Sequence, residues 1–307
     1  MEDYNKIIES LSVRFLNAKN IHVVNPFSVQ NHYDVENYLF LLHNGEITYG
    51  KEKIAVSKGD MLFVPGGKML SLSFGLEAEK HKINNEEFIS NREKYFEPNK
   101  EIAEIGKKEN SFSYITFESK VYDTINFFAS LDIPPFIIDD NPTLARLIKE
   151  IVVEDLSNGY GRHRMMHIKT EQVIIEIVRY IIKKGLFIEQ LATKSTYFKD
   201  PRLIDIFDYI KKYLGGDLSN KVLANVANVS EDYVGQYFKM LTGINPQDYI
   251  EYQRMERAVH LLRTSKKSIR EIGSEVGYKD TAYFCRRFKM MFGISAGKMR
   301  RRDAATA

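Results

Sequence analysis

Residues 229–262, VSEDYVGQYFKMLTGINPQDYIEYQRMERAVHLL, contain the pattern that decides how the rest of the chain is interpreted. Part of this pattern returns in residues 268–295, SIREIGSEVGYKDTAYFCRRFKMMFGIS. Pairs of positions share one offset of fifty residues, and they are Tyr233 and Tyr283, Val234 and Phe284, Phe238 and Phe288, Lys239 and Lys289, Gly243 and Gly293. Five pairs at one offset are hard to obtain by chance, so the sequence indicates a duplicated unit.

Each copy has the residue order of a helix, a tight turn and a second helix. In the first copy, Ser219 is a suitable N-cap for a helix that ends near Ala227, and Ser230 caps a helix that Gly243 ends. The second copy has equivalent signals in the same order, namely Ser268, Gly277, Asp280 and Gly293. Each copy is therefore predicted to be a helix-turn-helix unit.

A long helix is predicted between the two copies. Asn245 and Pro246 are typical of a helix start, and an apolar stripe continues to Arg263. Two helix-turn-helix units joined by one helix could place their second helices in neighbouring segments of the major groove.

These residues resemble the DNA-binding domain of the AraC/XylS family of transcription regulators. The resemblance covers about the last third of the chain, and the positions that carry it are Gly243, Pro246, Arg254, Ala258, Leu262, Ile272, Gly277, Tyr283, Phe284, Phe288 and Gly293. Two positions depart from the family. Gly273 stands where the family usually has Ala, which should loosen its helix by ~1 kcal/mol, and Ala296 replaces the usual Pro, which predicts a less ordered last turn.

Length and composition bound the architecture. A chain of 307 residues with 44% hydrophobic residues can form two domains. Cys285 is the single cysteine, so no internal disulfide is expected. No apolar run approaches ~20 residues and the start lacks signal-peptide features, which together predict a soluble cytoplasmic protein without a membrane span.

Charge is unevenly divided along the chain. Residues 201–307 hold 19 Lys and Arg against 12 Asp and Glu, a net charge of +7, whereas residues 1–200 carry a net charge of −4. A basic C-terminal part beside an acidic N-terminal part is the balance expected when one end of a protein meets phosphate. Ordinary scatter is the alternative explanation, and the duplicated unit makes it the weaker one.

The N-terminal part is predicted to be a β-rich sensor domain, residues 1–140. Short β-branched and aromatic runs alternate with turn signals through residue 75, which favours a small antiparallel barrel. The stretch GDMLFVPGG, residues 59–67, resembles cupin-like sensor domains. Residues 77–110 contain 16 charged residues and are predicted to be a solvated insertion, after which strands at 112–117 and 134–138 complete the barrel.

Helical periodicity replaces the strand pattern from Asn141 onwards. Two helices are predicted within residues 141–186, and the second has apolar residues on two stripes. One stripe could contact a second subunit through Ile168, Ile175, Val178 and Ile182, or both could be internal core. Members of the resembled family commonly dimerise here, which favours a homodimer. Residues 187–200 are predicted to be a linker, and 201–303 the DNA-binding domain, beginning with a helix over 201–214. The expected fold class is α+β.

Exposed positions early in each second helix are the candidates for DNA contacts. In the first unit they are Asp232, Gln236 and Lys239, and in the second they are Lys279, Thr281, Ala282, Cys285, Arg286 and Lys289. Gln236 can pair with adenine, Arg286 with guanine, and Lys289 suits a phosphate. In the first helix-turn-helix unit the second helix begins with acidic residues, which repel phosphate. The second helix-turn-helix unit is therefore predicted to read the DNA bases more strongly. For Arg286 and Arg287, a solvated face or an internal ion pair is the alternative.

Enzymatic functions are weakly supported. His22, His32 and His43 are not closely spaced as in cupin metal sites, and His163 and His167 lack an acidic partner in a metalloprotease pattern, so no metal or cofactor is expected. The favoured hypothesis is a sequence-specific transcription regulator, and a cupin-type metal enzyme with a DNA-tethering domain is the alternative. The resemblance implies promoter DNA, RNA polymerase and a small-molecule effector as partners. Candidate effector contacts are Tyr33, Tyr38, Phe40, His43, Tyr49 and Phe63.

Overall fold

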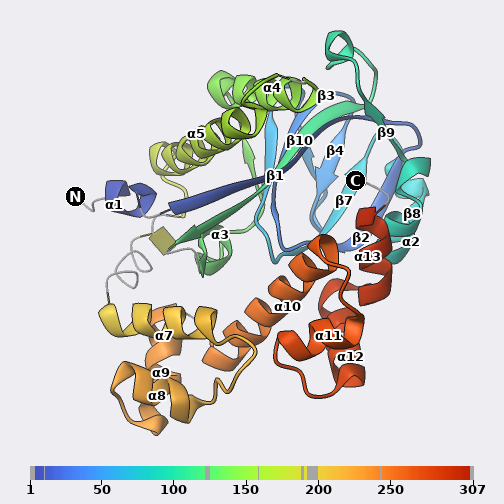
Figure 1. Ribbon diagram of the computed structural model, residues 1–307. Helices are drawn as coiled ribbons and strands as arrows, with labels where there is room; N and C mark the ends of the chain where they lie inside the picture. The colour runs from blue at the N-terminus through green and yellow to red at the C-terminus, as the bar shows by residue number, and fades with distance from the viewer. Residues whose placement is uncertain are drawn as a thin grey trace. The chain divides into compact units, whose positions relative to one another are not determined.

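The computed structural model describes residues 4–9, 11–121, 125–157, 159–187, 190–191, 200–242 and 244–304. The chain divides into two compact units, Met1–Ile188 and Glu189–Ala307, the first rich in strands and the second helical (Figure 1). The predicted α+β class is confirmed. Most of the predicted linker, together with Gly243, lies outside the described residues.

Two sheets form the first unit. The larger has strand order β12-β6-β3-β10-β1-β9 with β11 beside β10, and the smaller has the order β5-β4-β7-β2-β8. Their bounds are β1 Leu11–Val23, β2 Phe27–Tyr33, β3 Asn37–Asn44, β4 Ile47–Tyr49, β5 Ile54–Val56, β6 Met61–Val64, β7 Met69–Phe74, β8 Lys82–Asn84, β9 Phe96–Asn99, β10 Ser111–Val121, β11 Ile125–Asn126 and β12 Phe136–Ile138.

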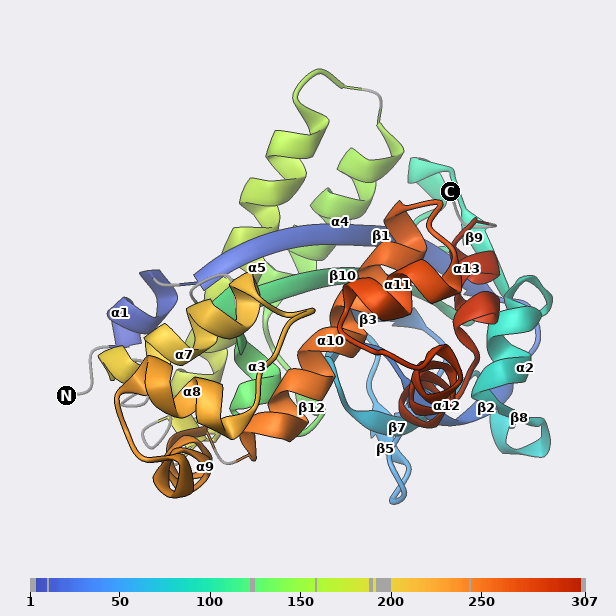
Figure 2. The same cartoon turned by 60° about the horizontal axis from the view of Figure 1, so that its bottom comes forward.

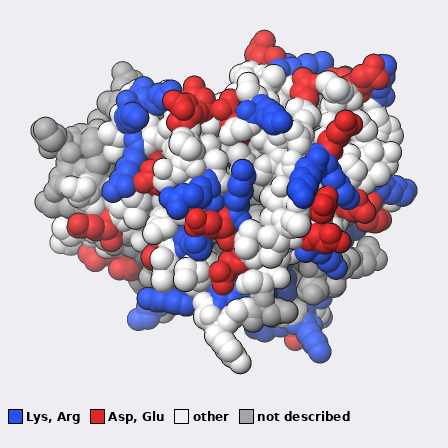
Figure 3. Space-filling view, turned by 90° about the horizontal axis from the view of Figure 1, so that it is seen from above, with Lys and Arg blue, Asp and Glu red and all other residues white. Residues whose placement is uncertain are grey.

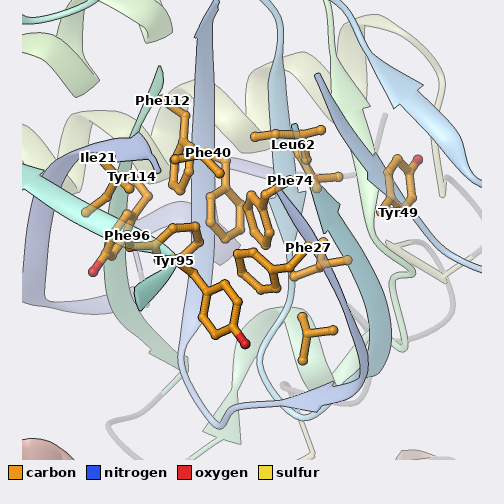
Figure 4. Close-up of a cluster of buried hydrophobic side chains, with 14 of the residues drawn as sticks. Ile21, Phe27, Phe40, Tyr49, Leu62, Phe74, Tyr95, Phe96, Phe112 and Tyr114 are labelled. Atoms are coloured by element: carbon orange, nitrogen blue, oxygen red, sulfur yellow. The ribbon is translucent and has the colours of Figure 1, made fainter. Parts of the chain in front are cut away.

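The closed barrel predicted from the sequence is wrong. In the part of the chain that the structure describes, no strand pairing joins the two sheets into one cylinder, and β12 is an edge strand that pairs only with β6. Strand alternation directs Phe40 of β3 and Phe112 of β10 towards Phe27 and Phe74 of the smaller sheet. These rings share one core cluster (Figure 4), so packing of apolar faces holds the sheets together.

The charged segment 77–110 is part of the fold and not a solvated insertion. Its elements are η1 Ala78–Lys80, β8, α2 Asn85–Ser90, η2 Arg92–Lys94, β9 and η3 Ile102–Glu104. Strand β8 pairs with β2, and β9 pairs with β1. Phe88, Tyr95 and Phe96 are buried against Phe27. Charge density misled the sequence prediction because three aromatic residues at irregular spacing supply the buried contacts.

The first unit also contains helices outside the charged segment. They are α1 Tyr4–Glu9 before β1, α3 Phe127–Ser130, α4 Pro142–Leu156 and α5 Arg162–Lys183. Asn141 caps α4 by accepting a hydrogen bond from the Leu144 backbone N–H, as the Asn-Pro pair predicts. Helices α4 and α5 pack on each other and on β1 of the larger sheet. Surface ion pairs such as Arg146–Glu150 accompany them. On the face of the molecule drawn in Figure 3, basic and acidic side chains are interspersed.

Seven described helices form the second unit. They are α7 Pro201–Lys212, α8 Asn220–Ala227, α9 Glu231–Thr242, α10 Pro246–Thr264, α11 Ile269–Glu275, α12 Thr281–Phe292 and α13 Ala296–Ala304. In Figures 1 and 2, α8 and α9 lie at one end of α10, whereas α11 and α12 lie at its other end. Helix α13 forms after Ala296 and buries Met299 against the rest of the unit. The end of the chain lies outside the described residues, so the less ordered last turn stays a prediction.

Candidate nucleic-acid interface

Two helix-turn-helix units are present, α8–α9 and α11–α12. The short helices end alike, because the Val229 N–H donates to the Ala224 carbonyl and the Tyr278 N–H donates to the Gly273 carbonyl. Asn228 and Gly277 occupy the left-handed position of each turn, at φ 53° and 94°. The first helices are therefore offset by 49 residues and the second helices by fifty, so the second turn is one residue longer.

Capping of the short helices differs. Ser268 and Glu271 form a reciprocal capping box at α11, whereas Ser219 precedes α8 without a side-chain cap bond. Asp280 caps α12 through the Ala282 and Tyr283 N–H groups at 2.7 and 3.1 Å. Gly293 ends α12 in the left-handed conformation at φ 72°, as predicted.

The two second helices bury one face and expose the other. Helix α9 buries Val234, Tyr237 and Phe238, and α12 buries Phe284, Phe288 and Phe292. The residues predicted to contact DNA lie outside these faces: Asp232, Gln236, Lys239, Lys279, Ala282, Arg286 and Lys289 are exposed, and Thr281 and Cys285 are half-buried. Each helix therefore presents a polar surface on a rigid apolar base.

Arg286 and Arg287 have different surroundings. Arg287 extends back to α10, where its Nε donates to Glu251 Oε1 at 2.5 Å and its Nη2 donates to Oε2. This bidentate ion pair raises the pKa of Arg287. Arg286 is exposed on α12. Arg287 is thus the internal ion pair, and its neighbour is left on the outer face.

Sequence reasoning missed a contact within the helical unit, between the loop before α8 and the turn after α11. Arg254 of α10 donates from Nε to the Leu214 carbonyl at 3.0 Å and from Nη2 to the Gly216 carbonyl at 2.9 Å. Its guanidinium lies so close to Gly277 that a Cβ there would be 2.8 Å from Cζ. One side chain therefore binds the loop before α8 and packs on the turn after α11. Glycines at 215, 216 and 277 were the available signal.

Tyr233 and Tyr283 were also missing from the predicted contacts. They occupy equivalent positions of α9 and α12 and are 44% and 46% exposed, although large aromatic side chains are usually buried. Their equivalence under the fifty-residue offset was visible in the sequence.

The residues predicted to contact an effector do not lie on one face. Phe40 and Tyr49 belong to the cluster between the sheets, and the partly buried Tyr38 packs against it. Phe63 packs on Phe117 and Phe128 on the opposite face of the larger sheet. Tyr33 is buried on β2.

His43 lies in a buried polar group on the face of the larger sheet that also contains Phe63. Its Nε2 is 2.8 Å from Ser113 Oγ, and the Ser113 hydroxyl donates to Asn20 Oδ1 at 3.3 Å. Burial, followed by the charge of Lys149, lowers the pKa of His43 to about 4. A neutral imidazole that is buried and hydrogen-bonded in this way fits a structural role for His43 in the core.

The predicted dimer residues of α5 differ in exposure. Ile168 is exposed and Ile175 and Ile182 are half-buried, but Val178 is 2% exposed and belongs to the core of its own unit. On the same helix, His167 pairs with Glu171 at 3.3 Å. Across the described residues, no cluster of three or more His, Cys, Asp or Glu could hold a metal ion. No described helix is long and apolar enough to span a bilayer.

Comparisons with known proteins agree with this geometry. A helix-turn-helix domain family matches residues 223–302. An uncharacterised HTH-type transcriptional regulator of Haemophilus influenzae is 23% identical over 266 residues, 85% of each chain. The Transposon Tn10 TetD protein of Escherichia coli is 30% identical over 112 residues, which cover 36% of this chain and 81% of TetD. The chain spans about a third of the length of several operon regulatory proteins that it also matches.

A solved structure covers both units. ToxT from Vibrio cholerae aligns over 96% of this chain and 98% of its own, with a TM-score of 0.53 and 11% identity, which shows a shared fold. Tandem helix-turn-helix units on one long helix, a β-rich unit before them and these relatives agree. The chain belongs to the AraC/XylS family of DNA-binding transcription regulators.

Proposed function

We propose that the chain binds promoter DNA sequence-specifically by inserting α9 and α12 into adjacent segments of the major groove, and that it activates transcription there. The observation that carries this proposal is the matched outward faces of α9 and α12, whose buried faces fix them to one scaffold. The exposed Lys279, Arg286 and Lys289 add positive charge around α12, which favours contact with phosphate.

Helix α12 supplies the stronger base readout. Arg286 has the fork geometry for guanine O6 and N7, and it is exposed, whereas Arg287 takes the ion pair with Glu251. Thr281 and Ala282, at the start of the helix, suit a thymine methyl group. Lys279 and Lys289 bind phosphates, and Cys285 lies half-buried between base contacts.

Helix α9 is the weaker reader. Gln236 is exposed and can pair with adenine through N6 and N7. Asp232 can only accept a hydrogen bond, chiefly from cytosine, and together with Glu231 it repels nearby phosphates. Lys239 offsets that repulsion at the other end of the exposed face.

The β-rich unit, Met1–Ile188, acts as the regulatory part of the chain. A small-molecule effector that binds one conformation more tightly shifts the population of DNA-competent protein. RNA polymerase is the partner at the promoter, and a homodimer forms through the outer face of α5 at Ile168, Ile175 and Ile182. Val178 is excluded from this surface by its burial.

Selection of bound sequences from random duplex, followed by anisotropy titrations, tests the proposal. Arg286→Ala should cost about 1–3 kcal/mol at one base position and relax preference there, whereas Lys289→Ala should weaken all sequences alike and reduce the salt slope. Arg146→Ala, a charge removal in the first unit, is the matched control and should leave both properties unchanged. The proposal is wrong if the wild-type chain enriches no sequence over bulk DNA at physiological salt.

A further inference from the structure

Arg92 is held by aromatic rings in the first unit. Its guanidinium carbon lies 5.7 Å from the ring centroids of Phe88 and Phe96 and 5.8 Å from that of Tyr114. Nη2 donates to the Tyr114 hydroxyl at 3.1 Å. A guanidinium has five N–H donors, and this residue is half-buried, so most of its donors remain for another acceptor.

A second cation lies beside this site. Lys19 of β1 is directly opposite Tyr114 of β10 in the antiparallel register. Burial lowers the pKa of Lys19, the charge of Arg92 lowers it further, and Asp155 acts in the opposite direction. Within the described part of the chain, neither Lys19 nor Arg92 has a carboxylate at ion-pair distance. Burial opposes the charged form of Arg92, but Tyr114, Tyr38 and Asp34 together raise its pKa. Two cations thus share a partly desolvated place, and an added anion would be attracted by both charges.

An unpaired hydroxyl points to the same place. Thr116 follows Tyr114 by two residues on β10 and lies opposite Tyr38 of β3, so its side chain is on the same face as both tyrosines. The residue is 1% exposed, and among the described residues its Oγ1 has no hydrogen-bond partner. A buried hydroxyl without a partner is unfavourable in the empty protein and becomes useful when a ligand supplies an acceptor.

We propose that Lys19, Arg92 and Thr116 bind a small organic anion whose carboxylate or phosphate pairs with the two cations and whose apolar body lies against Tyr38 and Tyr114. Two oxygens of a carboxylate or of a phosphate match the guanidinium fork, and the aromatic side chains favour an unsaturated or aromatic body. This inference rests on the proposed regulatory role of the first unit and names the chemical class of its effector. It also replaces most of the six contacts predicted from the sequence.

Calorimetric titration of the full chain tests the site with four probes. Phenylacetate and phenyl phosphate carry both charge and an apolar body, phenylacetamide carries the body alone, and inorganic phosphate the charge alone. At least one of the two organic anions should bind with a Kd of about 1 mM or tighter, and at least about tenfold more tightly than phenylacetamide and inorganic phosphate. Comparison of the carboxylate with the phosphate identifies which oxyanion the site prefers.

Variants locate the binding. Arg92→Met and Lys19→Met should each weaken the preferred probe by about tenfold or more. Thr116→Val should weaken it less while leaving the Tm unchanged or higher, because it removes an unpaired hydroxyl. Arg14→Met removes a cation from the same strand, where Arg14 pairs with Glu118, and should bind like wild type. Should Arg92→Met fail to fold, Lys19→Met and Thr116→Val still decide the question.

Three results would overturn the site. They are equal binding of phenylacetamide and the organic anions, wild-type affinity in the Lys19 and Arg92 variants, or no binding of either organic anion at about 1 mM. DNA selection by the same preparations separates the two proposals. If the wild-type chain selects DNA but binds neither anion, the anion site is wrong while the proposed function stands.

Discussion

Gly215 and Glu275 lie in direct contact: a Cβ on Gly215 would lie 2.3 Å from the Glu275 carbonyl oxygen. Gly215 belongs to the loop before α8, and Glu275 ends α11. The approach is possible only because position 215 lacks a side chain. Together with Arg254, this contact joins the loop before α8 to the end of α11 and the turn that follows it.

Gly215→Ala should therefore destabilise the second unit by about 1–3 kcal/mol, because the added methyl forces backbone apart. Chemical denaturation measures the loss. Gly297→Ala is the matched control, since nothing lies within 4 Å of its Cβ position and the change should be neutral or stabilising by up to about 1 kcal/mol. Equal stability of the Gly215 variant and wild type would contradict the close approach.

Arg286→Ala and Arg287→Ala should have opposite consequences. Loss of the exposed Arg286 should change the free energy of unfolding by less than about 0.5 kcal/mol while reducing DNA discrimination. Loss of Arg287 leaves Glu251 without its partner and should cost about 1–2 kcal/mol of stability, a value moderated by the 30% and 22% exposure of the two side chains. Denaturation curves and DNA titrations on both variants distinguish these roles.

A double-mutant cycle refines the second result. Arg287→Ala and Glu251→Ala should show a coupling free energy of about 1 kcal/mol or more. Either substitution alone already removes both hydrogen bonds of the ion pair. Additive effects would show that the ion pair does not anchor α12 to α10.

Acidification should weaken the fold through His43. The unfolded histidine has the ordinary pKa of 6.5 and the folded one about 4, so the unfolded state takes up the proton first. The stabilisation is complete above pH 6.5 and is lost as the pH falls towards 4, by about 2 kcal/mol between pH 7 and 5. His43→Gln should flatten this dependence, because it removes the group whose pKa differs between the folded and unfolded states. Identical pH profiles for wild type and His43→Gln would refute the assignment.

Phe96→Ala should destabilise the first unit by about 3–5 kcal/mol, although it lies in the segment with the highest charge density. The Phe96 ring is within 5.1–5.6 Å, centroid to centroid, of Phe27, Phe74, Phe88 and Phe112. Ile102→Ala in the same segment is the control, because Ile102 is 49% exposed and should cost little. Equal Tm values for the two variants in thermal unfolding would instead support the prediction that residues 77–110 are a solvated insertion.

The helical unit was predictable in detail because its signals are local. Caps at Asp280 and Ser268, the left-handed Gly293 and the apolar spacing of Val234 and Phe238 each act within one or two turns of helix. The first unit was predicted less well. Turn signals revealed most strands, but whether strands close into a barrel depends on pairings between residues far apart in sequence, and local periodicity does not specify these.

The amino-acid sequence by itself determined the family and the two helix-turn-helix units. It also determined which side chains of α9 and α12 lie outside the buried faces, because helical periodicity separates buried from exposed positions. Only the tertiary structure decided that Arg287 pairs with Glu251, that Gly215 meets Glu275, and that Phe88 and Phe96 join the core. The physical reason is that each of these contacts joins residues from different elements, and the energy of such a contact appears only after the chain has folded.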